Sequence, residues 1–168
     1  MDYGKVVAEA LEKEKETDIE DILTHTAVSL LPKYDIRDQE IEVEWRSKEG
    51  WLKIIGRPDM LDSKTFNFRE IKTGKTKWSE SKAQKHLQMR WYAMLIYIKY
   101  GKILHEAYLD WIETENTDEG IKPTGRVESF KVVFSLSDIL STMALAMKTA
   151  KEIEIAYASH VAVDHKPW

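Results

Sequence analysis

The stretch GRPDMLDSKTFNFREIKTGK, residues 56–75, places two carboxylates and a lysine at the ends of two short apolar runs. Asp59 follows Gly-Arg-Pro, and a single residue separates Glu70 from Lys72. Both runs have the composition of β-strands, and the Asp-Ser-Lys cluster at 62–64 between them favours a tight turn. The stretch therefore predicts two neighbouring strands that carry acidic and basic side chains.

We expect an antiparallel hairpin formed by residues 54–62 and 65–72, with Asp59 opposite Phe68. Because side chains alternate between the faces of a strand, Glu70 then shares a face with Asp59 as its diagonal neighbour, about 7 Å away at the backbone. A slip of two residues in the turn preserves this arrangement, and the lysine lies beside the two acids. Two converging carboxylates can bind one hard cation such as Mg²⁺.

These groups suit the hydrolysis of a phosphodiester bond. A carboxylate-bound Mg²⁺ lowers the pKa of its water and polarises the phosphoryl oxygen. A neighbouring lysine can orient the water or stabilise the charge that develops. The competing interpretation is an ordinary surface hairpin, because a Glu-x-Lys triplet in a strand is commonly a solvated face and an Asp at a strand end is common in turns.

Two features further along the chain favour a functional site. Gln88 and Tyr92 are spaced i, i+4 on a predicted helix and share one face, although a core tyrosine beside a glutamine would have the same pattern. Residues 72–90 carry six basic residues against one acid, where a phosphate backbone would approach. An aromatic residue there could stack on a base or pack on the core. The candidate DNA-contacting residues are Thr73, Lys75, Lys77, Trp78, Lys82, Lys85 and Arg90.

The composition indicates a single domain, residues 1–168, with 43% hydrophobic residues and a net charge of −4. The absence of cysteine excludes disulfides, thiolate zinc sites and iron–sulfur clusters. No apolar run approaches the ~18 residues of a membrane span, and the N-terminus lacks the pattern of a signal peptide. We expect a soluble, cytoplasmic protein, and its small size suggests a phage, viral or prokaryotic source.

The hydrophobic periodicity predicts a mixed α/β fold, a central mixed β-sheet flanked by helices, in the order α(α)βββαββα. We expect a helix at 3–15 and a second from about Thr17 to Pro32. Three strands follow at 40–46, 51–61 and 65–73. A helix at about 81–100 has Gly101 after its end, and its apolar stripe is Leu87, Trp91, Leu95 and Ile98.

Beyond that helix we expect a strand at 103–113, a polar loop at 114–125 and a strand at 127–136. Ser137 is positioned to cap a last helix at 138–158. The inward-facing residues of this helix are expected to be Ile139, Met143, Met147, Ala150 and Ile153.

The three motifs resemble the PD-(D/E)XK nuclease superfamily, in its RecB-like branch. That branch shows G-x-x-D on one strand, D/E-x-K-T on the next and Q-x-x-x-Y on the following helix. Here these are residues 56–59 (GRPD), 70–73 (EIKT) and 88–92 (QMRWY). The C-terminal strand and helix are also similar to those of mitochondrial genome-maintenance and phage exonucleases. The resemblance implies a restriction-endonuclease-like core without an iron–sulfur cluster.

By this resemblance, Asp59, Glu70 and the carbonyl of Ile71 would ligate Mg²⁺ or Mn²⁺, and Lys72 would be the catalytic lysine. Gln88 and Tyr92 would position DNA or the lysine. The branch also supplies a ligand from a first helix with the pattern G-x-x-V-H-x-x-L-E. This chain has GKVVAEALE at residues 4–12, with alanine at the histidine position. The expected substitute is Glu9, and the alternatives are Glu12, Glu20 and His25.

The resemblance implies a metal-dependent deoxyribonuclease, an exonuclease acting on DNA ends or single strands in recombination or repair. The alternative is a non-cleaving module on the same scaffold that binds DNA or a recombination partner. A sequence-specific restriction enzyme is disfavoured because 168 residues leave no extra recognition segment. Some relatives form rings, so a homo-oligomer remains open.

Overall fold

The fold is described from a computed structural model, which describes residues 34–37, 40–47, 50–104, 106–118 and 120–164. The two expected N-terminal helices, and with them Glu9, Glu12, Glu20 and His25, lie outside the described residues. Within the described part, the strands and helices follow the expected mixed α/β order. No described helix combines the length and apolarity needed to span a membrane.

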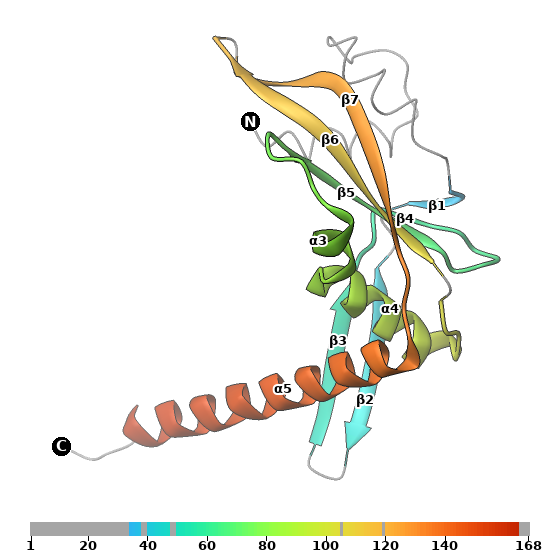
Figure 1. The fold of residues 1–168 in the computed structure, drawn as a ribbon. Helices are drawn as coiled ribbons and strands as arrows, with labels where there is room; N and C mark the ends of the chain where they lie inside the picture. Colours follow the sequence, from blue (N-terminus) through green and yellow to red (C-terminus); the bar gives the residue numbers. More distant parts are fainter. Residues whose placement is uncertain (1–33, 38–39, 48–49, 105, 119, 165–168) are drawn as a thin grey trace.

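The central sheet has five strands in the order β1-β4-β5-β6-β7 (Figure 1). Among the described strands of this sheet, only the central β5–β6 pair is parallel, and the other three pairs are antiparallel. The strands are β1 (Ile36–Arg37), β4 (Met60–Leu61), β5 (Phe68–Gly74), β6 (Ala107–Thr117) and β7 (Gly120–Val132). The mixed sheet agrees with the expected fold class.

The expected hairpin between 54–62 and 65–72 forms only in part. β3 (Gly50–Gly56) pairs with β2 (Ile41–Ser47) in a separate two-stranded sheet. The chain leaves that sheet after Gly56. Of the predicted strand at 51–61, only the part in β4 pairs with β5, with Met60 opposite Arg69. The register is therefore shifted by two residues from the expected one. The turn is formed by Asp62, whose carboxylate accepts hydrogen bonds from the backbone of residues 64 and 65.

A helical crossover joins the parallel strands β5 and β6, as parallel pairing requires. The expected single helix at 81–100 is two helices, α3 (Glu80–Gln84) and α4 (Leu87–Tyr100), separated by a corner at residues 85–86. Ser79 caps α3 through its side chain, and Gly101 ends α4 in the left-handed conformation expected for it.

Helix α4 is buried on most of its surface because it packs between the sheet, β2–β3 and α5 (Figure 1). The expected stripe is only partly correct, since Leu95 is fully buried but Leu87 is 52% exposed. The buried surface is centred on residues 92–96 instead. Tyr92 meets Phe68 of β5 edge to face, with ring centroids 5.5 Å apart.

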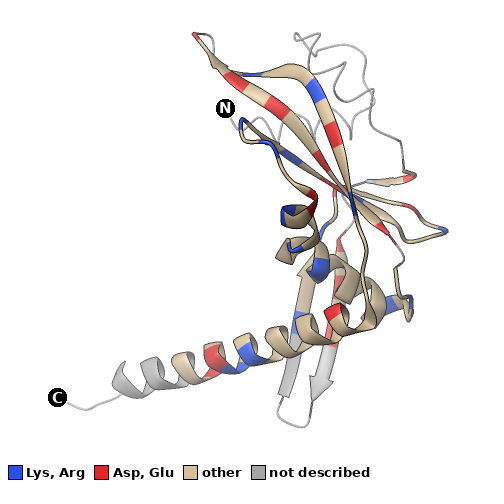
Figure 2. Ribbon diagram, in the orientation of Figure 1, with Lys and Arg blue, Asp and Glu red and all other residues tan. Residues whose placement is uncertain are grey.

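The expected loop at 114–125 is instead the end of a long β6–β7 hairpin. Thr117 lies opposite Gly120 at its tip, and a register irregularity falls between Ile112 and Thr114. Pro123 fits within β7 because that strand is at the edge of the sheet. The charged residues of β6 are all acidic, whereas β7 carries both basic and acidic residues (Figure 2).

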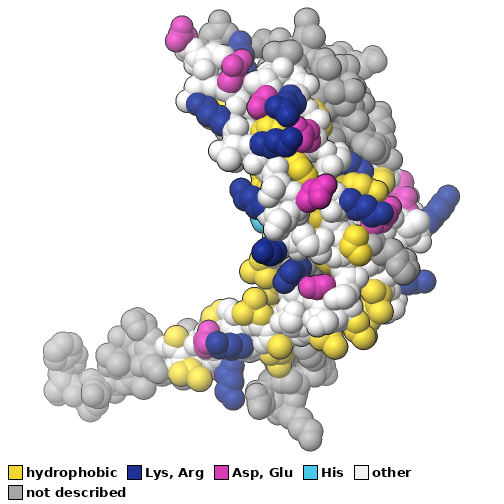
Figure 3. Space-filling view, viewed as in Figure 1, with side chains coloured by type: hydrophobic (Ala, Val, Ile, Leu, Met, Phe, Trp, Pro, Cys, Tyr) yellow, Lys and Arg dark blue, Asp and Glu magenta, His cyan; other side chains and the backbone are white. Residues whose placement is uncertain are grey.

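The last helix, α5 (Leu136–Asp164), starts two residues earlier and ends later than expected. Its cap is Ser135 rather than Ser137, because Ser135 and Asp138 exchange hydrogen bonds in the manner of a capping box. The helix packs on α4 near its start, and its later turns project away from the other described elements (Figure 1). Ile139 is buried as expected, whereas Ile153 is 64% exposed. Apolar side chains are visible along α5 in Figure 3.

A buried ion pair lies on the face of β5 opposite to Glu70 and Lys72. Arg69 donates to both oxygens of Asp110 on β6, over 2.7 and 2.6 Å, and to Ser129 on β7. The guanidinium also lies 4.6 Å from the centre of the Tyr108 ring. These contacts tie the three central strands together.

We expect Asp110→Ala to lower the free energy of unfolding by about 3–5 kcal/mol, because it leaves the Arg69 charge buried without its partner. Urea unfolding measures the effect. The matched control is Lys53→Met, which breaks the exposed Lys53–Glu42 pair and should leave the unfolding curve in place. Equal stability of wild type and Asp110→Ala would contradict the structural role of the pair.

Candidate metal and phosphodiester site

The carboxylate of Asp59 lies against the middle of β5. Extending the β4–β5 register by one residue places Asp59 level with Glu70. Asp59 Oδ2 accepts a hydrogen bond of 2.6 Å from the backbone amide of Ile71. A shift of two residues leaves each side chain on the same face of its strand, so Asp59 and Glu70 still occupy neighbouring positions.

Glu70 is almost fully buried, with 3% of its surface exposed. Its Oε2 atom has no hydrogen-bond partner within the described part of the chain. Burial, reinforced by the negative charge of Asp59 and opposed by Lys72, raises the pKa of Glu70 to about 7. A buried carboxylate with an unsatisfied oxygen is destabilising by itself, and a cation would compensate for it.

The ammonium group of Lys72 connects the sheet to helix α4. Its Nζ donates to Glu70 Oε1 over 2.6 Å and to Gln88 Oε1 over 2.7 Å. A lysine ammonium has three donors, so one remains for a water or a phosphate oxygen. The side chain is 27% exposed, which keeps it accessible beside the buried acid.

A chain of hydrogen bonds fixes the amide of Gln88. Its Nε2 donates to the Tyr92 hydroxyl over 2.7 Å, and that hydroxyl donates to the carbonyl of Arg57 over 2.8 Å. Burial raises the pKa of Tyr92 well above its usual range, so the hydroxyl stays protonated. With Nε2 occupied by Tyr92, the carbonyl oxygen of Gln88 faces Lys72.

The carboxylates that could hold a metal in the described part are Asp59 and Glu70. No group of three or more His, Cys, Asp or Glu that could hold a metal occurs among the described residues. Glu9 and its alternatives fall outside them. The buried, unpartnered oxygen of Glu70 and the adjacent Asp59 form an all-oxygen donor set, which fits Mg²⁺ or Mn²⁺ rather than a soft metal.

The lysines of the basic segment differ in the contacts that they make within the protein. Lys75 and Lys85 are exposed. Lys77 forms a 2.7 Å ion pair with Glu128 of β7, and Lys82 lies 4.1 Å from the centre of the Trp78 ring. Figure 2 shows basic residues on α3 and around the start of α4.

Three further candidate residues have less freedom to contact DNA. Trp78 is half-buried and packs against the core. Of the two roles that the sequence allowed, base stacking and core packing, the structure displays packing. Arg90 forms an ion pair with Asp138 of α5. Thr73 is half-buried on β5, beside Lys72.

Sequence reasoning missed two residues near the site. His86 precedes α4, and burial followed by the charges of Lys72 and Lys82 lowers the pKa of its imidazole. Gly56 lets α4 approach β3 closely, because a Cβ there would lie 2.5 Å from Leu95 Cδ1 and 2.9 Å from Tyr92 Cδ1. The glycine of the G-x-x-D motif was the available signal for the second.

Comparison with known proteins identifies the family. Residues 4–155 match the family described as the PD-(D/E)XK nuclease superfamily. A solved structure titled "Crystal structure of SSO0001" is 14% identical, with a TM-score of 0.42 over 68% of this chain and 50% of that one. The chain thus spans about half the length of that structure. No curated protein matches the chain.

The raised pKa of Glu70 predicts a pH-dependent stability in the absence of metal. The pKa of Glu70 in the folded state, about 7, lies above the ordinary 4.5. Between pH 4.5 and 7, the folded state therefore holds a proton that the unfolded state has released. Wild type should lose up to about 3 kcal/mol relative to Glu70→Gln as the pH rises from 4.5 to 7. Urea unfolding in EDTA across this range measures the difference. Parallel pH profiles for the two proteins would contradict the burial of an ionisable Glu70.

We expect Gly56→Ala to destabilise the protein by about 1–3 kcal/mol, because the added methyl overpacks the contact between β3 and α4. Thermal unfolding measures the loss, with the exposed Lys102→Ala as control. In a double-mutant cycle with Leu95→Ala, the two effects should be less than additive, since the second change removes the atom that the methyl meets. Full additivity would argue that the close approach is not what requires glycine.

Proposed function

Because the chain belongs to the PD-(D/E)XK nuclease superfamily, a group of nucleases that use divalent metal ions, we propose how its own residues hydrolyse a phosphodiester bond. The observation that carries the proposal is the contact of Lys72 with both Glu70 and Gln88. It brings an ammonium, a buried carboxylate and a helix amide together next to Asp59.

In this proposal, Asp59, Glu70 and the carbonyl of Ile71 hold Mg²⁺ or Mn²⁺, and a first-helix acid, Glu9 or one of its alternatives, completes the set. Such an ion, when bound, polarises a phosphoryl oxygen and lowers the pKa of its water. Asp59 is oriented for this role by its bond to the Ile71 amide. Glu70 must be deprotonated to act as a ligand, so protons compete with the metal ion for this carboxylate and a lower pH weakens metal binding.

Lys72 orients the attacking water or stabilises charge on the phosphate through its remaining donor. Gln88 holds the ammonium in place, and Tyr92 holds Gln88. The Q-x-x-x-Y pair therefore fixes where the lysine stands relative to the acids. The burial of Tyr92 and Glu70 limits water around these bonds and strengthens them.

The proposed substrate is DNA, with the exposed Lys75 and Lys85 as its first phosphate contacts. Lys77 and Lys82 are exposed as well, and they can exchange their internal partners for phosphates, because exposed ion pairs contribute little stability. We favour an exonuclease acting on ends or single strands. A cytoplasmic location and a phage or prokaryotic source remain predictions from the sequence.

The non-cleaving DNA-binding module is the second candidate. It is less well supported, because a binding scaffold does not need an ammonium held between a buried acid and a helix amide. It predicts salt-sensitive DNA binding without turnover under any divalent metal.

Digestion of 5′- and 3′-labelled single- and double-stranded oligonucleotides with Mg²⁺ or Mn²⁺ tests the proposal. We expect cleavage that EDTA abolishes and that Asp59→Asn, Glu70→Gln and Lys72→Met each reduce by at least roughly 100-fold. Glu152→Gln, on the exposed part of α5, serves as the matched control and should keep full activity. Wild-type turnover in Lys72→Met would remove the lysine from the mechanism, and DNA binding without any cleavage would favour the second candidate.

A further inference from the structure

The corner between α3 and α4 determines where Gln88 stands. α3 ends at Gln84 and α4 begins at Leu87, so Gln88 is in the first turn of the second helix. His86, at the N-terminal cap, makes no side-chain capping bond. Backbone hydrogen bonds from Lys85 to Ser81 and from His86 to Ala83 close the turn after α3. Because no side chain caps the start of α4, contacts with other elements supply further restraints on its position.

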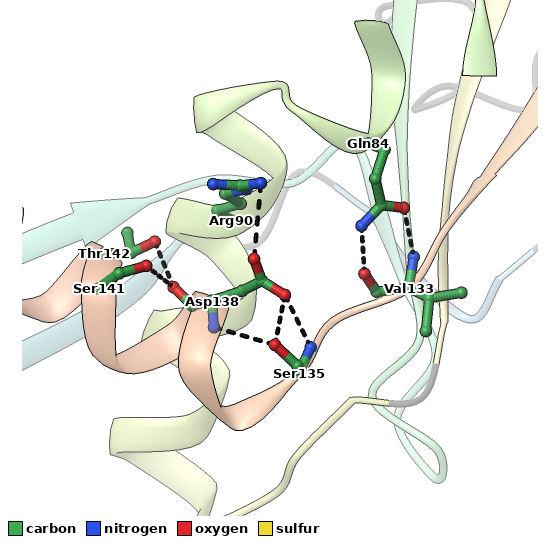
Figure 4. A network of polar contacts seen from close by, with 7 residues as sticks. All are labelled: Gln84, Arg90, Val133, Ser135, Asp138, Ser141 and Thr142. Carbon is green, nitrogen blue, oxygen red and sulfur yellow. Dashed lines mark hydrogen bonds and ion pairs between the residues drawn. The ribbon is translucent and has the colours of Figure 1, made fainter. Parts of the chain in front are cut away.

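Gln84 supplies the first of these contacts. Its Nε2 donates to the carbonyl of Val133 over 2.5 Å, and the amide of Val133 donates back to Gln84 Oε1 over 3.1 Å (Figure 4). Val133 directly follows β7. The side chain thus pairs with the backbone as a neighbouring strand would, and two bonds fix both its distance and its orientation.

Arg90 supplies the second contact, from the other side of the corner. Its Nη2 lies 3.5 Å from Oδ1 of Asp138 in the first turn of α5 (Figure 4). The other oxygen of Asp138 accepts hydrogen bonds from the amide and hydroxyl of Ser135. These bonds, with a smaller effect of Arg90, hold the pKa of Asp138 below its usual range, so the pair is ionised at neutral pH.

Arg90 is thereby distinguished from the exposed lysines of the basic segment. Its side chain is 29% exposed, and its Nε atom is buried without a hydrogen-bond partner among the described residues. A phosphate would have to reach the guanidinium donors that Asp138 leaves unoccupied, on a side chain that is less than a third exposed. Lys85, on the corner itself, is exposed and can reach a phosphate without such a change.

We propose that Arg90 is a positioning residue rather than a phosphate ligand, and that Arg90–Asp138 and Gln84–Val133 together clamp the α3–α4 corner so that Gln88 meets Lys72. This inference rests on the proposed nuclease function. Through the clamp, the position of the β7–α5 junction determines where Lys72 stands, although no side chain of the clamp contacts Asp59 or Glu70.

Positioning and phosphate binding have different kinetic consequences. Loosening the corner misplaces Gln88 and the lysine ammonium, which lowers kcat. The exposed Lys75 and Lys85 keep their charges and can still reach a phosphate through their long side chains. Removing a phosphate contact raises KM and reduces the salt dependence of binding, with a loss of about 0.7–0.9 in the slope of log K against log salt concentration. The two roles can therefore be separated by measuring both quantities.

The experiment compares Gln84→Ala and Arg90→Met with Lys85→Met, and uses Glu152→Gln as control. We expect the first two to lower kcat by roughly 10- to 100-fold, with KM and the salt slope of DNA binding unchanged. Lys85→Met should raise KM and reduce the salt slope of DNA binding, with kcat unchanged. Arg90→Lys, which keeps the charge beside Asp138, should restore most of the kcat lost in Arg90→Met. A reduced salt slope with unchanged kcat in Arg90→Met would overturn the proposal.

Hydrogen exchange provides a readout that does not depend on activity. Amides at 86–90 should exchange faster in Gln84→Ala and Arg90→Met than in wild type, in variants whose thermal unfolding still shows a single folded state. Unchanged exchange in both variants would overturn the clamp. If wild type itself shows no turnover, the proposed function fails, and this exchange test still decides whether the clamp exists.

Discussion

The site depends on one ammonium group placed between a strand and a helix. Lys72 donates to Glu70 on its own strand and to Gln88 on α4, so it joins the two elements that the site requires. The absence of a side chain at Gly56 lets α4 approach β3 closely, and Tyr92 of the same helix packs on Phe68 of β5. Tyr92 then closes the arrangement by bonding the carbonyl of Arg57.

The two faces of β5 handle buried charge in different ways. Arg69 is paired with both oxygens of Asp110, and Ser129 and aromatic rings complete its surroundings. Glu70, the next residue, keeps one buried oxygen without a partner among the described residues and has a raised pKa. The first face stabilises the sheet. The second carries an unfavourable charge arrangement that a bound cation would relieve, as expected of a functional site.

Much of the fold could be predicted from local signals. The turn at Asp62 and the helix end at Gly101 follow from residue chemistry. The predicted register was wrong by two residues, but such a shift keeps each side chain on its face of the strand, so Asp59 still lies level with Glu70. Strand partners could not be predicted, because the alternation of side chains shows which face each one occupies and not which strand lies beside it. In the structure β3 pairs with β2 instead of β5.

Longer-range contacts account for other differences. The β6–β7 hairpin has a polar sequence with Gly and Pro, and cross-strand pairing overrides that loop-like composition. The break at residues 85–86 has no Pro or Gly to signal it, and it is held by contacts with β7 and α5. The sequence of the basic segment could not show which of its cations already have partners within the protein.

The site as proposed requires that Asp59 and Glu70 jointly hold one divalent ion beside Lys72. Calorimetric titration of the protein with Mn²⁺ at pH 8 tests this most directly, in wild type, Asp59→Asn, Glu70→Gln and Lys72→Met. We predict one ion per chain in wild type and Lys72→Met, and a severe loss of affinity in either carboxylate variant. Undiminished Mn²⁺ binding by both carboxylate variants would contradict it.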